Sequence, residues 1–405
     1  MAFQDPTSQT YLLLLSVLPE AITDTMLRPL VPYLVRMLSS DLTADRLDAE
    51  VGSRAGLFSG VFYLPYCDSI GRKPILLLGL LFGGLTTFLL GINSSSFYFA
   101  IACRFVGGIF GGNSTVAKGA LGEIHQTEQG RISGIVGPLL GGVIVNPLLW
   151  NLHPGTFLYA TGFFTTSTFC NETSSQKDEK PDEPTTITPK ESFISMASKT
   201  PKVIVAIVLY TLICFCQSYW HSLLPLLFST HVDLGGLGFS AMDTSFAMSV
   251  PSTARLIVQT LFCQLVVQSL GPYNAYCVGM ALLLPATYGI GLLGGTVGSH
   301  IWPVVVGCLS VLGFVESVVF LSTMIMISNS VAPSYLGSAF GLSATCAAVV
   351  KTLAPPLSGA AWEFATMQMK SPWLAFGVIH IVGLASIGIA LIFRPAVSEK
   401  KEKKE

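Results

Sequence analysis

Apolar stretches recur along almost the whole chain, and short polar breaks separate them. Most stretches have about 17 to 25 residues, the length that lets a helix cross the hydrocarbon core of a bilayer. The pattern predicts an all-α membrane protein with six spans on each side of one long hydrophilic break. The expected spans are Gln9–Leu38, Arg54–Cys67, Ile75–Ile92, Phe97–Leu121, Ile132–Leu149 and Gly155–Cys170, then Val203–Phe228, Phe239–Ser269, Tyr273–Leu293, Ile301–Ile327, Leu336–Ala361 and Trp373–Phe393.

The hydrophilic break at Asn171–Thr200 is rich in Lys, Asp, Glu, Pro and Thr. Such a composition is typical of a flexible linker between two folded units. We therefore expect an N-terminal six-helix bundle at residues 1–170, a cytoplasmic linker at 171–200 and a C-terminal six-helix bundle at 201–394. Residues 395–405 form a charged tail.

The composition agrees with membrane insertion, because 51% of the residues are hydrophobic and only 11% are charged. Soluble domains carry roughly 25% charged residues. The net charge of −1 gives no field that would recruit nucleic acid, so the expected partners are the bilayer and a small-molecule substrate. The nine cysteines show no metal-ligand spacing, which predicts free thiols, no metal and no cofactor. Because no catalytic motif occurs either, we expect no enzyme.

Basic residues favour one side of the predicted topology. Cytoplasmic loops of membrane proteins carry an excess of Lys and Arg. If both termini are cytoplasmic, more than half of the Lys and Arg residues fall in cytoplasmic segments, including Arg72, Lys73, Arg131, the linker lysines and the lysines of the tail. We therefore expect a multi-pass protein with both termini in the cytosol. We also expect it to lie in the plasma or vacuolar membrane and to work as a monomer.

The loop after the second span reads Asp68-Ser-Ile-Gly71-Arg72-Lys73-Pro74. It resembles the loop between helices 2 and 3 of the major facilitator superfamily, although Leu64, Tyr66 and Ser69 stand where that family usually has Gly, Leu and Arg. Further segments resemble the family in the same order: Arg104–Gly108 with Gly111, Gly112 and Asn113 as the fourth helix, Gly122-Glu123-Ile124 as its cytoplasmic end, and Gly137-Pro138-Leu-Leu-Gly141-Gly142 as the end of the antiporter motif.

This resemblance implies the major-facilitator fold and secondary active transport of small organic solutes or drugs. It points to the drug:proton antiporter branch, near fungal and plant zinc-induced-facilitator-like members, and thus to proton-coupled efflux by alternating access. In such a carrier Asp68, Gly71, Arg72 and Lys73 form a cytoplasmic gate, with Glu123 as the candidate partner of Arg72. Ordinary topogenic charge is the alternative interpretation of this loop. Gly137 and Pro138 indicate either a moving bend or a static kink.

Ionisable residues inside spans are costly unless they are paired or hydrated, so each is a functional candidate. Glu20, Asp24 and Arg28 are spaced by four and share one helical stripe, which we expect to face a central cavity. We expect Glu20 or Asp24 to couple protons, with Arg104 as a counter-charge; a buried ion pair between helices 1 and 4 is the alternative. The other charged residues in spans are Arg255, Glu316 and Lys351, and we interpret His221 and His380 as packing residues.

The second half echoes the first but exposes missing residues in it. Asp68–Arg72 aligns with Gln268–Pro272, and Gly137–Gly142 aligns with Ala354–Gly359. Span 2 would be about 21 Å long against a hydrocarbon core of about 30 Å. We infer internal deletions of about ten residues each in helices 2 and 5, on the basis of this repeat. The alternative function is therefore a non-transporting or defective protein of the same fold: a sensor, an interaction partner or a truncated product.

Overall fold

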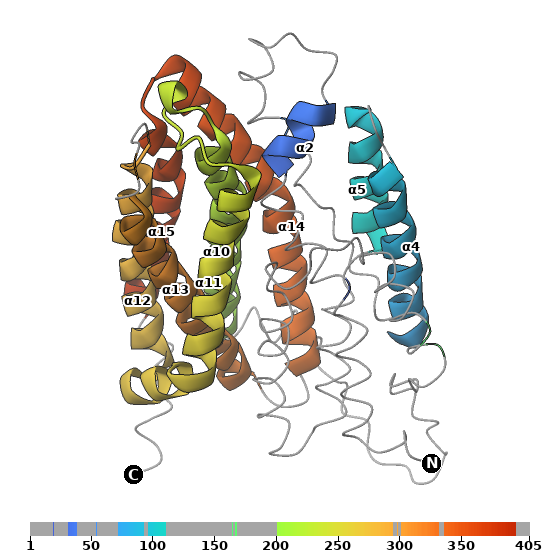
Figure 1. Cartoon of the computed structure of the whole chain (residues 1–405). Helices are drawn as coiled ribbons and strands as arrows, with labels where there is room; N and C mark the ends of the chain where they lie inside the picture. The colour runs from blue at the N-terminus through green and yellow to red at the C-terminus, as the bar shows by residue number, and fades with distance from the viewer. Residues whose placement is uncertain are drawn as a thin grey trace, which may run out of the picture.

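The computed structural model describes residues 19, 31–38, 54, 72–92, 96–110, 164, 167, 201–294, 298, 301–331 and 336–393. Every regular element in these ranges is a helix. Figure 1 shows the helices of the second half gathered into one bundle, with the pair α4 and α5 beside it and α2 reaching toward it.

The first half contributes three described helices: α2 at Val31–Leu38, α4 at Arg72–Ile92 and α5 at Phe97–Phe110. The helix expected at Ile75 begins three residues earlier, at Arg72. This is possible because Pro74 lies in the first turn, where its missing N–H leaves no hydrogen bond unmade. The other spans expected in this half lie outside the described residues, apart from single positions.

α4 and α5 pack tightly against each other. The rings of Phe82 and Phe110 are stacked with their centroids 3.9 Å apart. Gly107 approaches Thr86 so closely that a Cβ atom at this position would lie 2.8 Å from the Thr86 hydroxyl oxygen. Small residues are what allow two helices to approach in lipid, so this glycine serves packing.

The second half contains six helical regions, as the sequence predicts. Their boundaries are close to the expected ones except between the second and third of them, which meet at Leu261 and Cys263 and not between Ser269 and Tyr273. The six regions are α10 (Pro201–Ser229), α11 (Ala241–Leu261), α12 (Cys263–Gly291), α13 (Ile301–Ser330), α14 (Leu336–Glu363) and α15 (Gly377–Ile392). Short helices complete the connections: the 3-10 helix η3 (Val232–Leu234), the π-helix η5 (Phe364–Gln368) and the 3-10 helix η6 (Pro372–Phe376).

The region between α11 and α12 differs from the prediction of one straight helix over Phe239–Ser269. α11 ends at Leu261, and the segments 241–259 and 263–291 are bent by 84° relative to each other. Phe262 has non-helical dihedral angles, and neither a proline nor a glycine marks this break in the sequence. The second break, predicted between Ser269 and Tyr273, is confirmed: Gly271 has φ 76° and ψ 154°, a conformation that glycine adopts readily.

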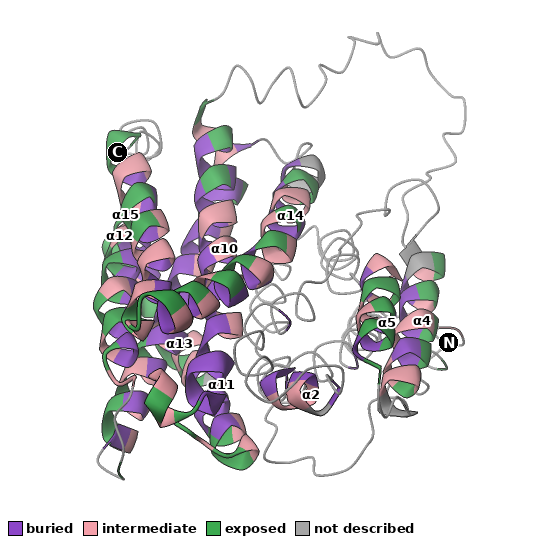
Figure 2. Cartoon of the chain, turned by 90° about the horizontal axis from the view of Figure 1, so that it is seen from above, coloured by how far each residue is buried: buried purple, intermediate pink, exposed green. Residues whose placement is uncertain are grey.

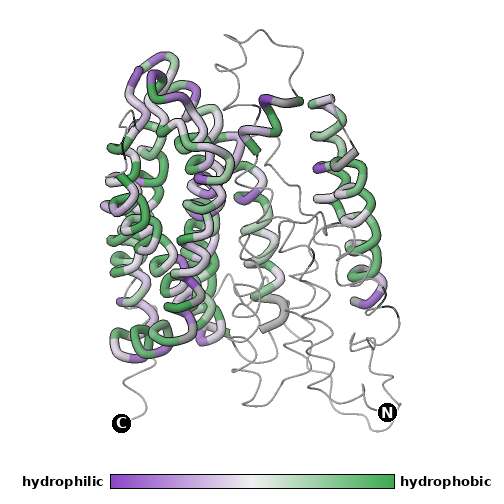
Figure 3. The backbone as a smooth tube through the Cα atoms, viewed as in Figure 1, coloured by the Kyte–Doolittle hydropathy of each residue, from purple (hydrophilic) through white to green (hydrophobic). Residues whose placement is uncertain are grey.

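Four of these helical stretches are long and apolar enough to cross a membrane: 201–229, 301–330, 339–368 and 372–392. The bent pair 241–259 and 263–291 meets the same test only as one unit, which would be a fifth span. The total of twelve spans therefore stays a prediction. Figure 3 shows apolar residues along most of the length of these helices.

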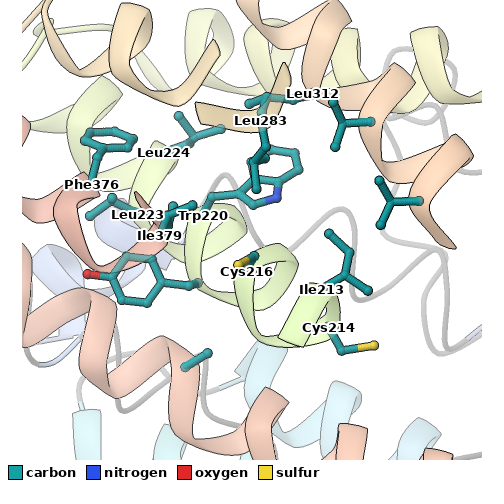
Figure 4. Packing of buried hydrophobic residues seen from close by; sticks show 14 of the residues in the cluster. Ile213, Cys214, Cys216, Trp220, Leu223, Leu224, Leu283, Leu312, Phe376 and Ile379 are labelled. Carbon is teal, nitrogen blue, oxygen red and sulfur yellow. The ribbon is translucent and has the colours of Figure 1, made fainter. Parts of the chain in front are cut away.

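α10 is the central helix of the bundle. Tyr219, Trp220, Leu223 and Phe228 on it are almost completely buried within the apolar core of the bundle. Figure 4 shows Trp220 and Leu223 of this helix together with Phe376. Figure 2 shows buried residues on most sides of α10, whereas the outer helices have exposed faces. On α15 these exposed residues are large and apolar: Ile381, Leu384, Leu391 and Ile392. An apolar exterior is suited to lipid.

The seven cysteines that the structure describes form no disulfide with one another: Cys103, Cys214, Cys216, Cys263, Cys277, Cys308 and Cys346.

We expect Gly313→Ala to destabilise the second-half bundle. A Cβ atom at Gly313 would lie 2.4 Å from the carbonyl oxygen of Pro251, so α11 and α13 would have to separate. Overpacking of this kind costs about 1–3 kcal/mol. The melting temperature of the purified protein in detergent measures the effect. Gly307→Ala is the matched control, because nothing lies within 4 Å of a Cβ atom there. Equal melting temperatures of the two variants would contradict the close approach.

Candidate functional site

Most of the site residues predicted from the sequence lie outside the described residues: Glu20, Asp24, Arg28, Asp68, Gly71, Glu123, Gly137, Pro138, Gly141 and Gly142. Of the others, Arg72 and Lys73 begin α4, and Arg104 is partly buried on α5. The cytoplasmic gate and the coupling role of the first span therefore stay predictions.

A buried charge cluster lies instead in the second half, where α10, α11 and α13 meet. Glu316 on α13 is 5% exposed. Its Oε1 atom lies 2.9 Å from Nε2 of His221 on α10, and its Oε2 atom lies 3.5 Å from a terminal guanidinium nitrogen of Arg255 on α11. We call His221, Arg255 and Glu316 the Glu316 cluster. It ties three predicted membrane helices together through one carboxylate.

Close packing of α11 on α13 positions Arg255. Gly313 lets the backbone of α11 approach, and one turn later the Ser317 hydroxyl donates to the carbonyl of Arg255 at 3.2 Å. Glu316 lies on the same face of α13 as Gly313, because residues three apart are neighbours on a helix. His221 is held by Trp220, since the two rings stack with centroids 4.0 Å apart.

The cluster combines one permanent cation with two titratable side chains. Arg255 keeps its charge at any physiological pH, whereas the Glu316 carboxylate and the His221 imidazole both titrate. With Glu316 ionised and His221 neutral, the three side chains sum to zero charge; one added proton makes the sum +1. A charge change at this depth is expensive, so it must alter hydration or helix contacts. The other packed helices add few charges: α12 carries none, and α14 carries Lys351 in its interior and Glu363 at its end.

The sequence interprets His221 as a packing residue, and the structure gives it an acidic partner on a neighbouring helix, since its Nε2 atom lies 2.9 Å from Oε1 of Glu316. The same interpretation of His380 is confirmed, because its Nε2 atom lies 3.1 Å from the Leu284 carbonyl and 3.3 Å from the Thr287 hydroxyl. The two histidines look alike in sequence, since each is a single titratable residue in an apolar span. Only the neighbouring helices distinguish them.

The middle of α10 has an accessible polar strip, although the helix is otherwise largely buried. The strip consists of partly exposed residues at spacings that share one side of a helix: Thr211, Gln217, Ser218, His221 and Ser222. The Glu316 cluster therefore adjoins a polar surface through His221. Among the described residues, no group of three or more His, Cys, Asp or Glu side chains could hold a metal ion.

A second set of contacts joins α2 of the first half to the second half. The Tyr33 hydroxyl donates to the carbonyl of Phe239 at 2.7 Å and lies 2.9 Å from the Thr244 hydroxyl. Arg36 donates to the carbonyl of Ser229, the last residue of α10, at 3.1 Å. We call these three hydrogen bonds the α2 latch. It closes the end of the molecule where α10 ends and α11 begins.

Comparison with known proteins agrees with this architecture. The family model of the Major Facilitator Superfamily matches residues 13–302 and 234–405 of this chain. The chain is 23% identical to Protein ZINC INDUCED FACILITATOR 1 of Arabidopsis thaliana, over 94% of this chain and 90% of that protein. It is 36% identical to the Bicyclomycin resistance protein homolog of Haemophilus influenzae over 107 residues, which is 23% of this chain and 26% of that protein.

Among solved structures, the fold is similar to that of the human organic anion transporter MFSD10 (TETRAN). The TM-score is 0.67 and the identity is 16%, with 96% of this chain and 100% of that chain covered. A likeness at this identity concerns the fold. The fold, the apolar helices and the family match across nearly the whole chain therefore lead to one conclusion: the chain belongs to the major facilitator superfamily and is an integral membrane transporter of small solutes.

Proposed function

We propose that this transporter exports organic solutes by alternating access and that a proton bound at the Glu316 cluster drives the cycle. The observation that carries the proposal is the buried contact of a carboxylate with an imidazole and a guanidinium from three different helices. Glu20 and Asp24, with Arg104, are the second candidate coupling set, because they lie in predicted spans of the first half.

The proposed coupling follows from the contacts of Glu316. While Glu316 is ionised, it attracts Arg255 on α11 and His221 on α10, and so stabilises the packing of these helices on α13. Protonation of the carboxylate removes the ionic attraction to Arg255. The helices can then exchange one packing arrangement for another, and reversal of the steps releases the proton. A ligand shifts a conformational equilibrium only through such a difference between the two states.

Export as the direction is supported by a relative. The Haemophilus influenzae relative is named for bicyclomycin resistance, which fits removal of an organic compound from the cell. The predicted orientation, with both termini in the cytosol of a monomeric carrier, belongs to the same proposal. The boundaries of the two predicted six-helix bundles, at residues 170 and 201, are also part of this proposal.

A second candidate is a protein of the same fold whose transport is reduced or lost. The alignment with the Arabidopsis relative extends over 445 positions, whereas the whole chain has 405 residues, so the alignment must open gaps in this chain. Such gaps support internal deletions in this chain, and the internal repeat is the reason for assigning them to helices 2 and 5. Those helices belong to the moving gates of carriers of this fold, and shortened gates would seal poorly.

One flux experiment separates the two candidates. Purified protein is reconstituted in liposomes, and efflux of organic dyes and antibiotics is followed at two pH values, with and without a protonophore. We expect a flux that follows the pH gradient and disappears with the protonophore, and a higher flux in a version restored at helices 2 and 5 with the aligned segments of the Arabidopsis relative.

The outcomes are distinct. A flux that the protonophore does not change would refute proton coupling. A rate equal to that of the reconstituted Arabidopsis relative would refute the inferred defect. Restored protein that carries a substrate when the parent chain carries none would place the defect in helices 2 and 5.

A further inference from the structure

Lys351 lies on the buried stripe of α14 and not on its lipid-facing side. Residues at spacings of three, four or seven share one side of a helix. Lys351 shares its side with a set of buried residues: Ser343, Ala347, Ala354, Ser358 and Trp362. The residues on the opposite side, such as Val349, Leu353 and Leu357, are exposed and apolar. The lysine is therefore on the side of α14 that faces the protein.

The accessible polar strip of α10 adjoins Lys351. The Ser218 hydroxyl donates to the Lys351 carbonyl at 3.2 Å, which fixes this turn of α14 against the turn of α10 just before His221. Farther along the strip the Ser222 hydroxyl donates to the Ser218 carbonyl at 3.1 Å, and Gln217 adds a partly exposed amide group with two N–H donors. A cation and an amide donor thus share one region between α10 and α14.

The charges in this region do not balance. The described spans of the second half carry Arg255, Glu316 and Lys351 in their interiors. Glu316 pairs with Arg255, and within the described residues no carboxylate lies within ion-pair distance of Lys351. A lysine at membrane depth costs several kcal/mol unless an anion or water compensates it. The described part of the carrier therefore has a cationic position with a donor beside it and no carboxylate of the described residues on it.

We propose that Lys351 and the polar strip of α10 bind an acidic group of the transported solute, such as a carboxylate, sulfonate or phosphate. The assignment deepens the proposed function and rests on it, since it takes the solute to pass along this surface. The ammonium group supplies the charge, and the Gln217 amide supplies neutral hydrogen bonds. The solute class is then organic anions or zwitterions.

A binding experiment tests the assignment without transport. Carboxyfluorescein and rhodamine 6G share a xanthene ring system but carry opposite charges, and their fluorescence anisotropy reports binding to the purified protein in detergent at one pH. We expect wild type to prefer carboxyfluorescein. Lys351→Gln weakens carboxyfluorescein binding by about 10- to 100-fold, the value of one charged hydrogen bond. Lys351→Arg retains most of the affinity, and rhodamine 6G binding changes by less than about twofold.

Lys370→Gln is the matched control, because Lys370 is exposed in the loop after η5. Three results would each overturn the assignment: unchanged carboxyfluorescein affinity in Lys351→Gln, preference of the wild type for rhodamine 6G, or binding of neither dye. The double variant Asp24→Asn with Lys351→Gln gives a fourth such result. If it binds carboxyfluorescein as well as the wild type does, the assignment is overturned, because Lys351 would then serve as the partner of Asp24. Failure of proton coupling alone leaves these binding results unaffected, so the two proposals fail separately.

Discussion

Glu316→Gln is expected to remove transport driven by a pH gradient and to leave solute exchange in place. Glutamine keeps the shape of a protonated glutamate but can neither take up nor release a proton. Net flux that requires deprotonation should therefore fall by about 100-fold or more, the size of effect expected when an acid–base group is lost. Exchange of labelled for unlabelled solute across the same membrane needs no deprotonation and should continue. Parallel measurement of both fluxes in proteoliposomes gives the result.

Two further variants keep this prediction falsifiable. Glu316→Gln leaves the Arg255 guanidinium without its carboxylate, and an uncompensated buried charge destabilises a protein by about 3–5 kcal/mol. Arg255→Gln combined with Glu316→Gln removes both charges, so it should fold better and still lack proton-driven flux. Glu363→Gln, at the end of α14, is the matched control. Normal proton-driven flux in the double variant would exclude the cluster as the coupling site. Where the flux of the parent chain is low, the variants are made in the version restored at helices 2 and 5, and the same ratios of variant flux to parent flux are expected there.

Tyr33→Phe combined with Arg36→Gln is expected to open the end of the molecule that the α2 latch closes. The two changes remove all three hydrogen bonds between α2 and the region from Ser229 to Thr244. At about 0.5–1.5 kcal/mol for a neutral bond and somewhat more for a charged one, the population of the open form should rise by about 100-fold. Hydrogen–deuterium exchange over 31–38 and 239–244 should quicken accordingly.

The turn at this end should keep its own structure in that variant. Phe239 stacks on Trp302 with centroids 4.8 Å apart, and its amide donates to the Phe228 carbonyl at 2.7 Å, so neither contact depends on α2. Tyr98→Phe on α5 is the control, because Tyr98 is 71% exposed. If exchange over 239–244 in the double variant matches that of the control, the three bonds do not hold this end closed.

Hydropathy alone was sufficient to place most of the helix ends of the second half. Val203–Phe228 was expected and α10 covers Pro201–Ser229, because a span must satisfy its backbone internally and therefore extends as far as the apolar run. The break at Gly271 was visible for a similar reason, since glycine followed by proline disfavours a continuous helix. The break at Phe262 was not visible, because nothing local in the sequence distinguishes that residue from its apolar neighbours.

The candidate site divides in the same way. The sequence identified Arg255, Glu316 and Lys351 as charges in spans because each is a local exception to an apolar pattern. It favoured Glu20, Asp24 and Arg28 for function because their spacing of four is visible along one helix. Contacts between helices have no such signature. The partners of Glu316 come from residues 61 and 95 positions earlier in the chain, at Arg255 and His221.

The sequence by itself showed that this protein lies in a lipid bilayer, where most of the second-half helices lie, and which family it resembles. These properties depend on local composition and short motifs. The tertiary structure alone decided which charges meet: it paired Glu316 with His221 and Arg255, placed His380 among packing contacts and set Lys351 beside the polar strip of α10. The physical reason is that a helix fixes the direction of its own side chains by its period of 3.6 residues, whereas its neighbours and its rotation against them depend on packing across the whole bundle.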